Sequence, residues 1–362
     1  MGTGNDTSTA QQTDWTEVIT NVRKASLVFY CLIFILGTVG NGLVIYVTGC
    51  RMKRTVNSVW FLNLALADFF FTAFLIFSII SASQGHQWHF GLIMCRLNSF
   101  VVVVNMFASI FLLTAISLDR CLSIWVVVWA QNERTVCKAQ VICVVIWITA
   151  AACTIPYAAF RDIGIRDGKT VCGYTSSMTL EKVWTLGIFR FVVGFLIPFL
   201  VIFVSYVAIG VRAGRLQRTR KKRPRPIIFS IVLAFFICWL PYHVVHFIEL
   251  KSYTDRNLGS IVEILGPPFL SLAFFNSCLN PILYVFMCDE FQNKLGQSVF
   301  FVLESALAED HMSSRSLSSH FSRVARKSDS TAPEDMKVTA TSYNFTESKV
   351  VIAAETETAS TE

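Results

Sequence analysis

The sequence predicts an all-α membrane protein, a seven-transmembrane helix bundle with a short amphipathic eighth helix. The composition is too apolar for a soluble domain of this size, because 54% of the 362 residues are hydrophobic and only 15% are charged. Seven stretches also contain no more than one Asp, Glu, Lys or Arg each, and each exceeds the ~20 residues that cross a ~30 Å hydrocarbon core. These stretches are residues 25–50, 55–85, 97–118, 139–160, 183–211, 226–248 and 264–288.

Basic residues in the short loops predict which side of the membrane each loop faces. The loop after the first span carries Arg51, Lys53 and Arg54. The loop after the fifth span carries eight basic residues and no acid between Arg212 and Arg225. Because such loops face the cytoplasm, we expect a multi-pass plasma-membrane protein with an extracellular N-terminus and a cytoplasmic C-terminus. This bias accounts for most of the net charge of +7, so the charge does not indicate nucleic-acid binding.

Composition divides the chain into four regions. Residues 1–25 form a polar extracellular tail without an apolar core, so we expect no cleavable signal peptide. Residues 26–288 form the transmembrane domain. In residues 289–302, apolar residues that begin with Phe291 recur at helical spacing, which predicts an amphipathic helix on the membrane surface. Residues 303–362 are polar and rich in Ser and Thr, which predicts a disordered cytoplasmic tail. The tail is either phosphorylated as a docking site or simply solvated.

Two features on the outer side predict covalent modification. Asn5 opens the sequence Asn-Asp-Thr, which is an acceptor for glycosylation in an extracellular segment. Cys95, at the top of the third span, and Cys172, in the second outer loop, face an oxidising compartment, so we expect a disulfide between them. The other nine cysteines lie in or beside apolar spans and are interpreted as small buried hydrophobic residues.

Asp68 is an acid in the middle of the second apolar span. Ionisable residues at this depth are functional candidates, because an unpaired charge in hydrocarbon is costly. One carboxylate among amide and hydroxyl oxygens suits a small hard cation such as Na⁺, and the alternative is a protonated, hydrogen-bonded Asp68. Candidate partners at similar depth are Asn41 and Ser277 and, as the remaining ligands of the expected sodium site, Asn105, Ser109, Asn276 and Asn280.

Asp119 and Arg120 end the charge-free run of the third span on the cytoplasmic side. The simple interpretation is a pair of charges that reach the membrane surface from a helix end. The alternative is a switch, in which Arg120 is held by the neighbouring Asp119 and moves to another partner when the helices move. Tyr206 on the fifth span and Tyr284 on the seventh carry the candidate hydroxyl groups for that second position.

Prolines interrupt the last three spans. Pro198, Pro241 and Pro281 each remove a backbone donor and permit a kink. Trp239 lies just before Pro241, where an aromatic side chain is either an ordinary part of the core or a switch beside a pivot. Asn280 precedes Pro281 near the cytoplasmic end of the seventh span, so a polar group and a hinge coincide there.

Arg190 lies in the outer half of the fifth span, where a charge must face a water-filled cavity or a partner. Arg161, at the outer end of the fourth span, is a second basic residue at this level, and two guanidinium groups suit the capture of a ligand carboxylate or carbonyl. The alternative is an internal salt bridge, for example to Glu249. The expected ligand-binding set also includes residues on one face of the sixth span, namely Tyr242, His243, His246 and Glu249.

Together these motifs resemble the rhodopsin class (class A) of G-protein-coupled receptors over residues 25–302. The matching strings follow the order of the family: Gly40-Asn41, Leu66-Ala67-Asp68, Asp119-Arg120-Cys121, Trp147, Pro198, Cys238-Trp239-Leu240-Pro241 and Asn280-Pro281-Ile282-Leu283-Tyr284. Other strings are similar to the leukocyte chemoattractant receptors, the group of the chemerin and formyl-peptide receptors. These strings are residues 55–64, 128–132, 160–162, 273–281 and 303–310.

The resemblance implies a receptor for a chemoattractant peptide or lipid acid that signals to leukocyte chemotaxis. It implies coupling through Arg120 to G proteins of the inhibitory class, a toggle at Trp239, a sodium site centred on Asp68 and the disulfide already expected. It also implies that arrestin and receptor kinases act on the tail. Members of the group place an arginine at the position of Arg190 to hold a polar end of the ligand.

Two departures from the group narrow the ligand. Formyl-peptide receptors carry an Asp in the upper third span, where this chain has only valines at 101–104, and a second Arg where this chain has Leu186. A formyl peptide is therefore not the expected ligand. The valine run also lacks the counter-ion of an amine, which disfavours amine ligands.

Other functional classes are less well supported by the sequence. A retinal-binding opsin needs a lysine in residues 264–288, which contain none. The chain has no HExxH, GxSG or GxGD motif, so we expect neither an enzyme nor a cofactor other than Na⁺. A transporter built on inverted repeats is disfavoured because no internal repeat is visible. A scavenging receptor that recruits arrestin without coupling to G proteins stays open as the alternative.

Overall fold

The computed structural model describes residues 6–166, 168–216, 227–287 and 296. The predictions for the glycosylation acceptor Asn5 and the tail at 303–362 lie outside the described residues, and of the surface helix expected at 289–302 only Gly296 is described.

The described residues contain seven helical segments long and apolar enough to cross a membrane, which confirms the predicted seven-helix fold. The helices are α1 (Asp6–Tyr46), α2 (Val56–Ser83), α3 (Gly91–Trp125), α4 (Val127–Asn132), α5 (Val136–Ala159), α6 (Leu180–Phe191), α7 (Ile197–Leu216), α8 (Ile227–Ser252) and α9 (Gly259–Met287). Short helical turns are η1 (Val47–Arg51), η2 (Val192–Leu196) and η3 (Arg256–Leu258). The fifth span consists of α6, η2 and α7.

Helix α1 begins well before the first apolar stretch. The polar tail predicted for residues 1–25 is helical from Asp6 onward. No glycine or proline lies between Asp6 and Tyr30, so nothing interrupts the backbone hydrogen-bond ladder as the helix leaves the apolar region. The boundary between tail and span is therefore a change in side-chain polarity, not a change in backbone structure.

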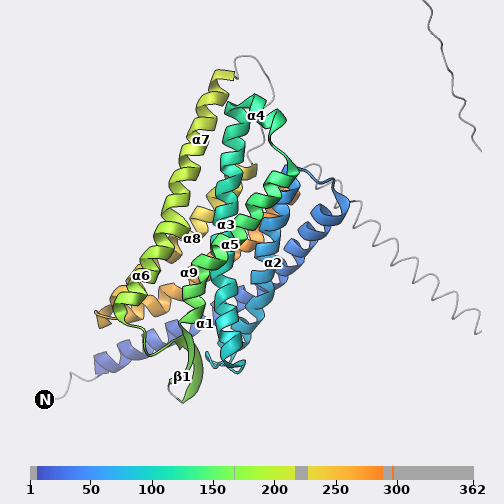
Figure 1. The fold of residues 1–362 in the computed structure, drawn as a ribbon. Helices are drawn as coiled ribbons and strands as arrows, with labels where there is room; N and C mark the ends of the chain where they lie inside the picture. The colour runs from blue at the N-terminus through green and yellow to red at the C-terminus, as the bar shows by residue number, and fades with distance from the viewer. Residues whose placement is uncertain (1–5, 167, 217–226, 288–295, 297–362) are drawn as a thin grey trace, which may run out of the picture. The chain divides into compact units, whose positions relative to one another are not determined.

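Helix α3 is the centre of the bundle. It contacts α2, α5 and α7 along its length, whereas α1 packs against α2 and α9, and α8 packs against α9 (Figure 1). Figure 1 shows α4 at one end of the bundle and strand β1 at the opposite end. The two ends correspond to the cytoplasmic and extracellular sides that the basic loops predict.

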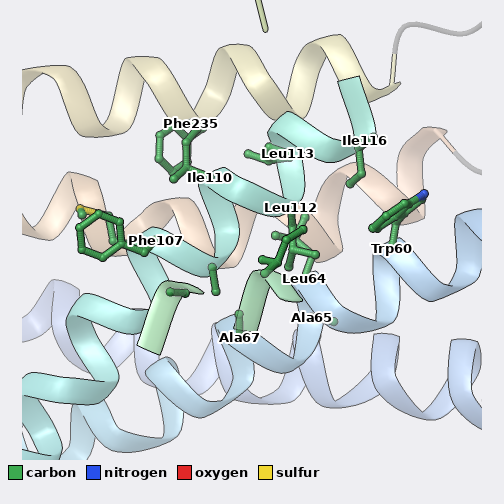
Figure 2. Close-up of a cluster of buried hydrophobic side chains, with 14 of the residues drawn as sticks. Trp60, Leu64, Ala65, Ala67, Phe107, Ile110, Leu112, Leu113, Ile116 and Phe235 are labelled. Atoms are coloured by element: carbon green, nitrogen blue, oxygen red, sulfur yellow. The ribbon is translucent and has the colours of Figure 1, made fainter. Parts of the chain in front are cut away.

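The core lies along α3 and is almost completely buried. Figure 2 shows α3 side chains between those of α2 and α8. The labelled residues are Trp60, Leu64, Ala65 and Ala67 of α2, Phe107, Ile110, Leu112, Leu113 and Ile116 of α3, and Phe235 of α8. Because lipid tails are as apolar as these side chains, close packing rather than exclusion of water holds such helices together.

A β-hairpin lies at the outer end of the bundle. Strand β1 (Arg161–Arg166) pairs antiparallel with β2 (Lys169–Tyr174), and Ile163 stands opposite Cys172. Cys172 forms a disulfide with Cys95 on α3, which confirms the predicted pair. The disulfide fixes the second outer loop to the central helix.

The fifth span contains a π-helical turn next to its proline. Pro198 cannot donate a backbone hydrogen bond, and η2 ends just before it, so the extra residue of the wide turn is taken up where the ladder is already broken. Gly194 permits this turn to approach α3, because a Cβ atom there would lie 2.8 Å from Cε of Met106 and 3.1 Å from Cε1 of Phe107.

Gly37 lies where α1 closely approaches α2 and α9. A Cβ atom at this position would collide with the γ-methyl group of Thr72 and lie 3.2 Å from Sγ of Cys278. We expect Gly37→Ala to destabilise the fold by about 1–3 kcal/mol, the usual cost of overpacking, and to lower the Tm of the purified protein. Gly49→Ala is the matched control, because nothing lies within 4 Å of the added atom, and it should keep or raise the Tm. Equal Tm values for the two variants would contradict the close packing.

Candidate functional site

Arg190 is a buried cation on the last turn of α6, and the residue is only 8% exposed. Its guanidinium carbon lies 5.2 Å from the ring centroid of Tyr242 and 5.9 Å from that of Tyr157. Within the described part of the chain, no hydrogen bond or ion pair joins this guanidinium to another residue, and its Nε atom is buried without a partner. The tyrosine faces stabilise the charge by about 0.5–2 kcal/mol each, while the N–H donors are left for a ligand.

Close contact between α6 and α8 places Arg190 beside the sixth span. One turn before Arg190, a Cβ atom on Gly187 would lie 2.8 Å from Cδ1 of Leu250 and 3.3 Å from Nε2 of His246. A larger residue at 187 would push the helices apart. Glycine at this position therefore brings the cation within reach of the α8 side chains that the sequence predicts as ligand contacts.

The β-hairpin adds Arg161 at the same level. The guanidinium carbon of Arg161 lies 4.4 Å from the ring centroid of Tyr174, and its Nε atom is buried without a partner among the described residues. The backbone carbonyl of Arg161 accepts a hydrogen bond of 3.0 Å from Nε of Arg96 on α3. The loop therefore presents a second guanidinium that also rests on a tyrosine face.

Glu249 on α8 is an acid close to these cations, and its hydrogen bond goes to His246 instead. Its Oε2 atom lies 3.1 Å from Nδ1 of His246. Arg190 and Arg161 both act on the Glu249 carboxylate through space. The internal salt bridge that the sequence left open is therefore not formed at contact distance among the described residues. Glu249 balances the two arginines from a distance instead.

His243 on α8 lies between the residues around Arg190 and the deeper aromatic residues of the bundle. The residue is only 1% exposed, and neither ring nitrogen has a hydrogen-bond partner in the described structure. Its ring centroid lies 5.6 Å from that of Phe191, 5.0 Å from that of Phe195 and 6.3 Å from that of Trp239. A ligand group that displaces or polarises His243 would thus reach Trp239 through one ring contact.

Trp239 lies between this aromatic group and the core. Its ring stacks on Phe235 with centroids 5.8 Å apart, and it meets Tyr242 edge to face at 5.6 Å. Phe235 packs into the buried cluster around α3 (Figure 2). Tyr242 and His243, which the sequence assigns to ligand binding, therefore contact Trp239, which the sequence assigns to the switch.

Asp68 is fully buried and lies where α2 meets α3 and α9. Its Oδ2 atom accepts a hydrogen bond of 2.6 Å from Nδ2 of Asn280. Ser277 also interacts with the Asp68 carboxylate. The amide of Asn105 lies 3.2 Å from Oδ1 of Asp68, and Oγ of Ser109 donates to Oδ1 of Asn105 over 3.4 Å.

The donor set around Asp68 fits a small hard cation. The Asn105 amide has two possible orientations. With its nitrogen towards α2, it donates to Asp68 and to the carbonyl of Ala67. With its oxygen towards α2, it offers a cation a further oxygen ligand beside the carboxylate. Ser277 and Ser109 add hydroxyl oxygens. Asn276, which the sequence included among the ligands, is buried but makes no hydrogen bond to this group in the described structure. Ser277, another candidate partner on α9, interacts with Asp68.

At the cytoplasmic end, the expected pair of Asp119 and Arg120 has different partners. Arg134, just after α4, donates to both oxygens of Asp119, with Nε at 2.9 and 3.1 Å and Nη2 at 2.9 Å. Arg120 donates instead to Oδ1 of Asn57 on α2 over 2.5 Å. The contacts of Arg134 and Asn57 were not predicted from the sequence. An arginine in a loop and an amide at the start of a helix are usually solvated, so neither residue suggests a buried contact.

Of the two tyrosines expected to offer a second position for Arg120, Tyr206 lies near it. Tyr206 on α7 interacts with Ser117 and acts on Arg120 through space. Tyr284 belongs to α9, but its side chain lies outside the described part of the structure. The cytoplasmic end thus holds Arg120 between an amide on α2 and a phenol on α7.

A comparison with known families and proteins agrees with this architecture. The family model described as 7 transmembrane receptor (rhodopsin family) matches residues 40–284. The chain is 41% identical to chemerin-like receptor 1 of Sus scrofa over 307 residues, which cover 80% of this chain and 84% of the relative. It is 42% identical to N-formyl peptide receptor 2 of Homo sapiens over 306 residues, 80% of this chain and 87% of the relative. It is 40% identical to prostaglandin D2 receptor 2 of Rattus norvegicus over 303 residues, 80% and 74% of the two chains.

Proposed function

Because the chain belongs to the rhodopsin family of seven-transmembrane receptors, we propose that it binds an extracellular chemoattractant by a carboxylate group at Arg190 and signals through inhibitory G proteins. One observation carries the ligand proposal. The Arg190 guanidinium is buried between two tyrosine rings and has no acid at contact distance among the described residues. A buried charge left in this way is costly unless a ligand completes its pairing.

A carboxylate is the group that suits this site best. A guanidinium binds a carboxylate by two parallel charge-assisted hydrogen bonds, which are stronger than neutral ones. Arg161 adds a second positive charge at the same level, and Glu249 is already hydrogen-bonded to His246. By their names, the relatives bind chemerin, formyl peptides and prostaglandin D2, so both peptides and lipid acids are ligand candidates here.

Ligand capture is transmitted along α8 in this proposal. A ligand that pulls on Arg190 and packs against Tyr242 and His243 shifts the aromatic chain that ends on Trp239. Pro241 interrupts the ladder of α8 close to Trp239, so the two halves of the helix can change their angle there. The cytoplasmic half then moves away from α3 and opens the surface around Arg120 to the G protein.

The choice of G protein is tested by nucleotide exchange on purified proteins. The receptor in lipid nanodiscs is mixed with inhibitory, stimulatory or phospholipase-coupled heterotrimers, and agonist-driven GTP loading is measured with chemoattractant peptides and long-chain fatty acids as probes. The proposal expects loading of the inhibitory heterotrimer alone. Arrestin recruitment by an agonist that loads none of the three would contradict it and would identify a scavenging receptor. Receptor kinases and arrestin are proposed to act on the Ser- and Thr-rich tail.

A sodium ion at Asp68 is proposed as an allosteric ligand. When bound, it would add a positive charge at the junction of α2, α3 and α9, held by Asp68, Asn105, Ser109 and Ser277, with Asn280 orienting the carboxylate. We expect sodium chloride to lower the affinity of the wild type for agonist several-fold relative to potassium chloride, and Asp68→Asn to remove the difference. The same sodium effect in both proteins, measured by ligand binding, would contradict the site.

A further inference from the structure

We infer that Arg134 is a positioning residue for G-protein coupling, which withholds Asp119 from Arg120 and so keeps the Arg120 guanidinium available to the G protein. This inference rests on the proposed coupling function. It concerns a loop residue that the motifs of the sequence do not mark.

Arg134 binds both oxygens of the Asp119 carboxylate. Nε and Nη2 of Arg134 meet the two oxygens of Asp119 at 2.9–3.1 Å, which is the side-on bidentate arrangement of a strong guanidinium–carboxylate pair. The Asp119 side chain is only 9% exposed and that of Arg134 21%, so water weakens the pair less than it weakens a surface salt bridge. Asp119 is thus satisfied without Arg120.

Two guanidinium groups share the next acceptor. Oδ1 of Asn57 accepts from Nη2 of Arg134 at 2.7 Å and from Nη2 of Arg120 at 2.5 Å. Arg120 and Arg134 therefore lie close enough to repel each other. Arg120 is hydrogen-bonded to a neutral amide and repelled by Arg134, and Asp119 attracts it only through space. Its Nε atom is buried without a partner among the described residues. This is weak restraint for a residue that must extend towards a partner protein.

The local structure holds Arg134 in place. Helix α4 ends at Asn132, and the hydroxyl of Thr135 caps the start of α5 by accepting from the backbone N–H of Lys138. The exposed side chains of Glu133 and Lys138 pair across the same turn, and the hydrogen bond from Lys138 lowers the pKa of the Glu133 carboxyl. Because the Glu133–Lys138 pair is exposed, it adds little to the stability of the loop. The end of α4 and the Thr135 cap therefore set the position from which Arg134 points back to α3.

The consequence of losing Arg134 follows from the burial of Asp119. A nearly buried carboxylate left without its cation pays a desolvation cost, and breaking such a pair from one side is strongly destabilising. Arg120 is the adjacent cation and would take the vacant carboxylate. It would then need to break a charge-assisted pair, rather than an amide hydrogen bond, before it could engage the G protein.

The test is a rescue experiment on receptor in nanodiscs, with an agonist peptide or fatty acid that drives exchange in the wild type. We expect Arg134→Gln to lower the agonist-driven exchange rate at least fivefold while the agonist Kd stays within twofold. Arg134→Lys, which keeps the charge without the bidentate geometry, should give an intermediate rate. Adding Asp119→Asn to Arg134→Gln should restore exchange to at least half of the wild-type rate, because the carboxylate that captures Arg120 is then gone. Lys138→Gln, which breaks only the exposed pair of the same loop, is the control and should leave exchange unchanged.

Two outcomes would overturn the inference. If Arg134→Gln exchanges nucleotide at the wild-type rate, the Arg134–Asp119 pair has no role in coupling. If Asp119→Asn fails to restore exchange in Arg134→Gln, Arg134 acts only by holding the loop structure. Absence of exchange in the wild type itself, with ligand binding intact, would instead overturn the proposed coupling function. The two failures are therefore distinguishable in one set of measurements.

Discussion

Arg120→Ala is expected to abolish agonist-driven nucleotide exchange while leaving ligand binding within a few-fold of the wild type. Arg120 lies at the cytoplasmic end of α3, held by the amide of Asn57 and close to Tyr206. The residues expected to bind the ligand, around Arg190, lie at the other end of the bundle. The substitution therefore removes the G-protein contact and leaves the ligand contacts in place. Exchange by purified heterotrimer and binding of a labelled agonist are measured on the same nanodisc sample.

A matched control separates loss of this arginine from loss of any cytoplasmic charge. Lys138→Ala removes an exposed cation on the same side, whose ion pair in the described part of the chain is with exposed Glu133. It should leave both exchange and binding unchanged. Equal exchange by wild type and Arg120→Ala would refute the coupling role of Arg120.

Arg190→Ala is expected to reduce affinity for carboxylate ligands by about 1.5–3 kcal/mol, the range of hydrogen bonds to charged groups. This corresponds to a roughly 10- to 160-fold rise in Kd, because each 1.36 kcal/mol is a factor of ten. The reason is that Arg190 has no competing acid at contact distance among the described residues, so its donors serve the ligand. Competition binding with an active peptide or fatty acid measures the change.

The ligand itself provides the sharpest control for Arg190. The free acid of one agonist is compared with its neutral amide in both proteins, and only the free acid should lose affinity in Arg190→Ala. Arg23→Ala removes an outer arginine whose partner is the half-exposed Glu263, and it should change neither affinity. Equal losses for acid and amide would make Arg190 a structural residue rather than a carboxylate anchor.

The helical spans could be predicted from the sequence because lipid forbids charge over long stretches. The charge gaps located the seven spans, and the oxidising outer side predicted the Cys95–Cys172 disulfide. The start of α1 at Asp6 could not be located in this way, since a polar sequence without glycine or proline is compatible with a helix or a tail. The π-helical turn at Val192–Leu196 was also missed, because the extra residue leaves the apolar pattern unchanged.

Some of the functional residues could be predicted from the sequence, and others could not. Asp68 and Arg190 were visible as charges where lipid excludes them, and both have specific surroundings in the structure. Their surroundings depend on the fold. The tyrosine rings beside Arg190 come from two separate helices, and of the α9 residues named as candidates Ser277 and Asn280 interact with Asp68. Arg134 was not identified from the sequence, because its pairing with Asp119 depends on the fold.

We propose that a carboxylate captured at Arg190 moves the cytoplasmic end of α8 away from its neighbours. This movement can be measured as the distance between spin labels placed at Cys137 on α5 and at position 227 on α8, with receptor in nanodiscs. We expect a carboxylate agonist to lengthen this distance by several ångströms in the wild type, and Arg190→Ala not to respond at the same agonist concentration. An unchanged distance in the wild type at saturating agonist, while the G protein is being loaded, would contradict it.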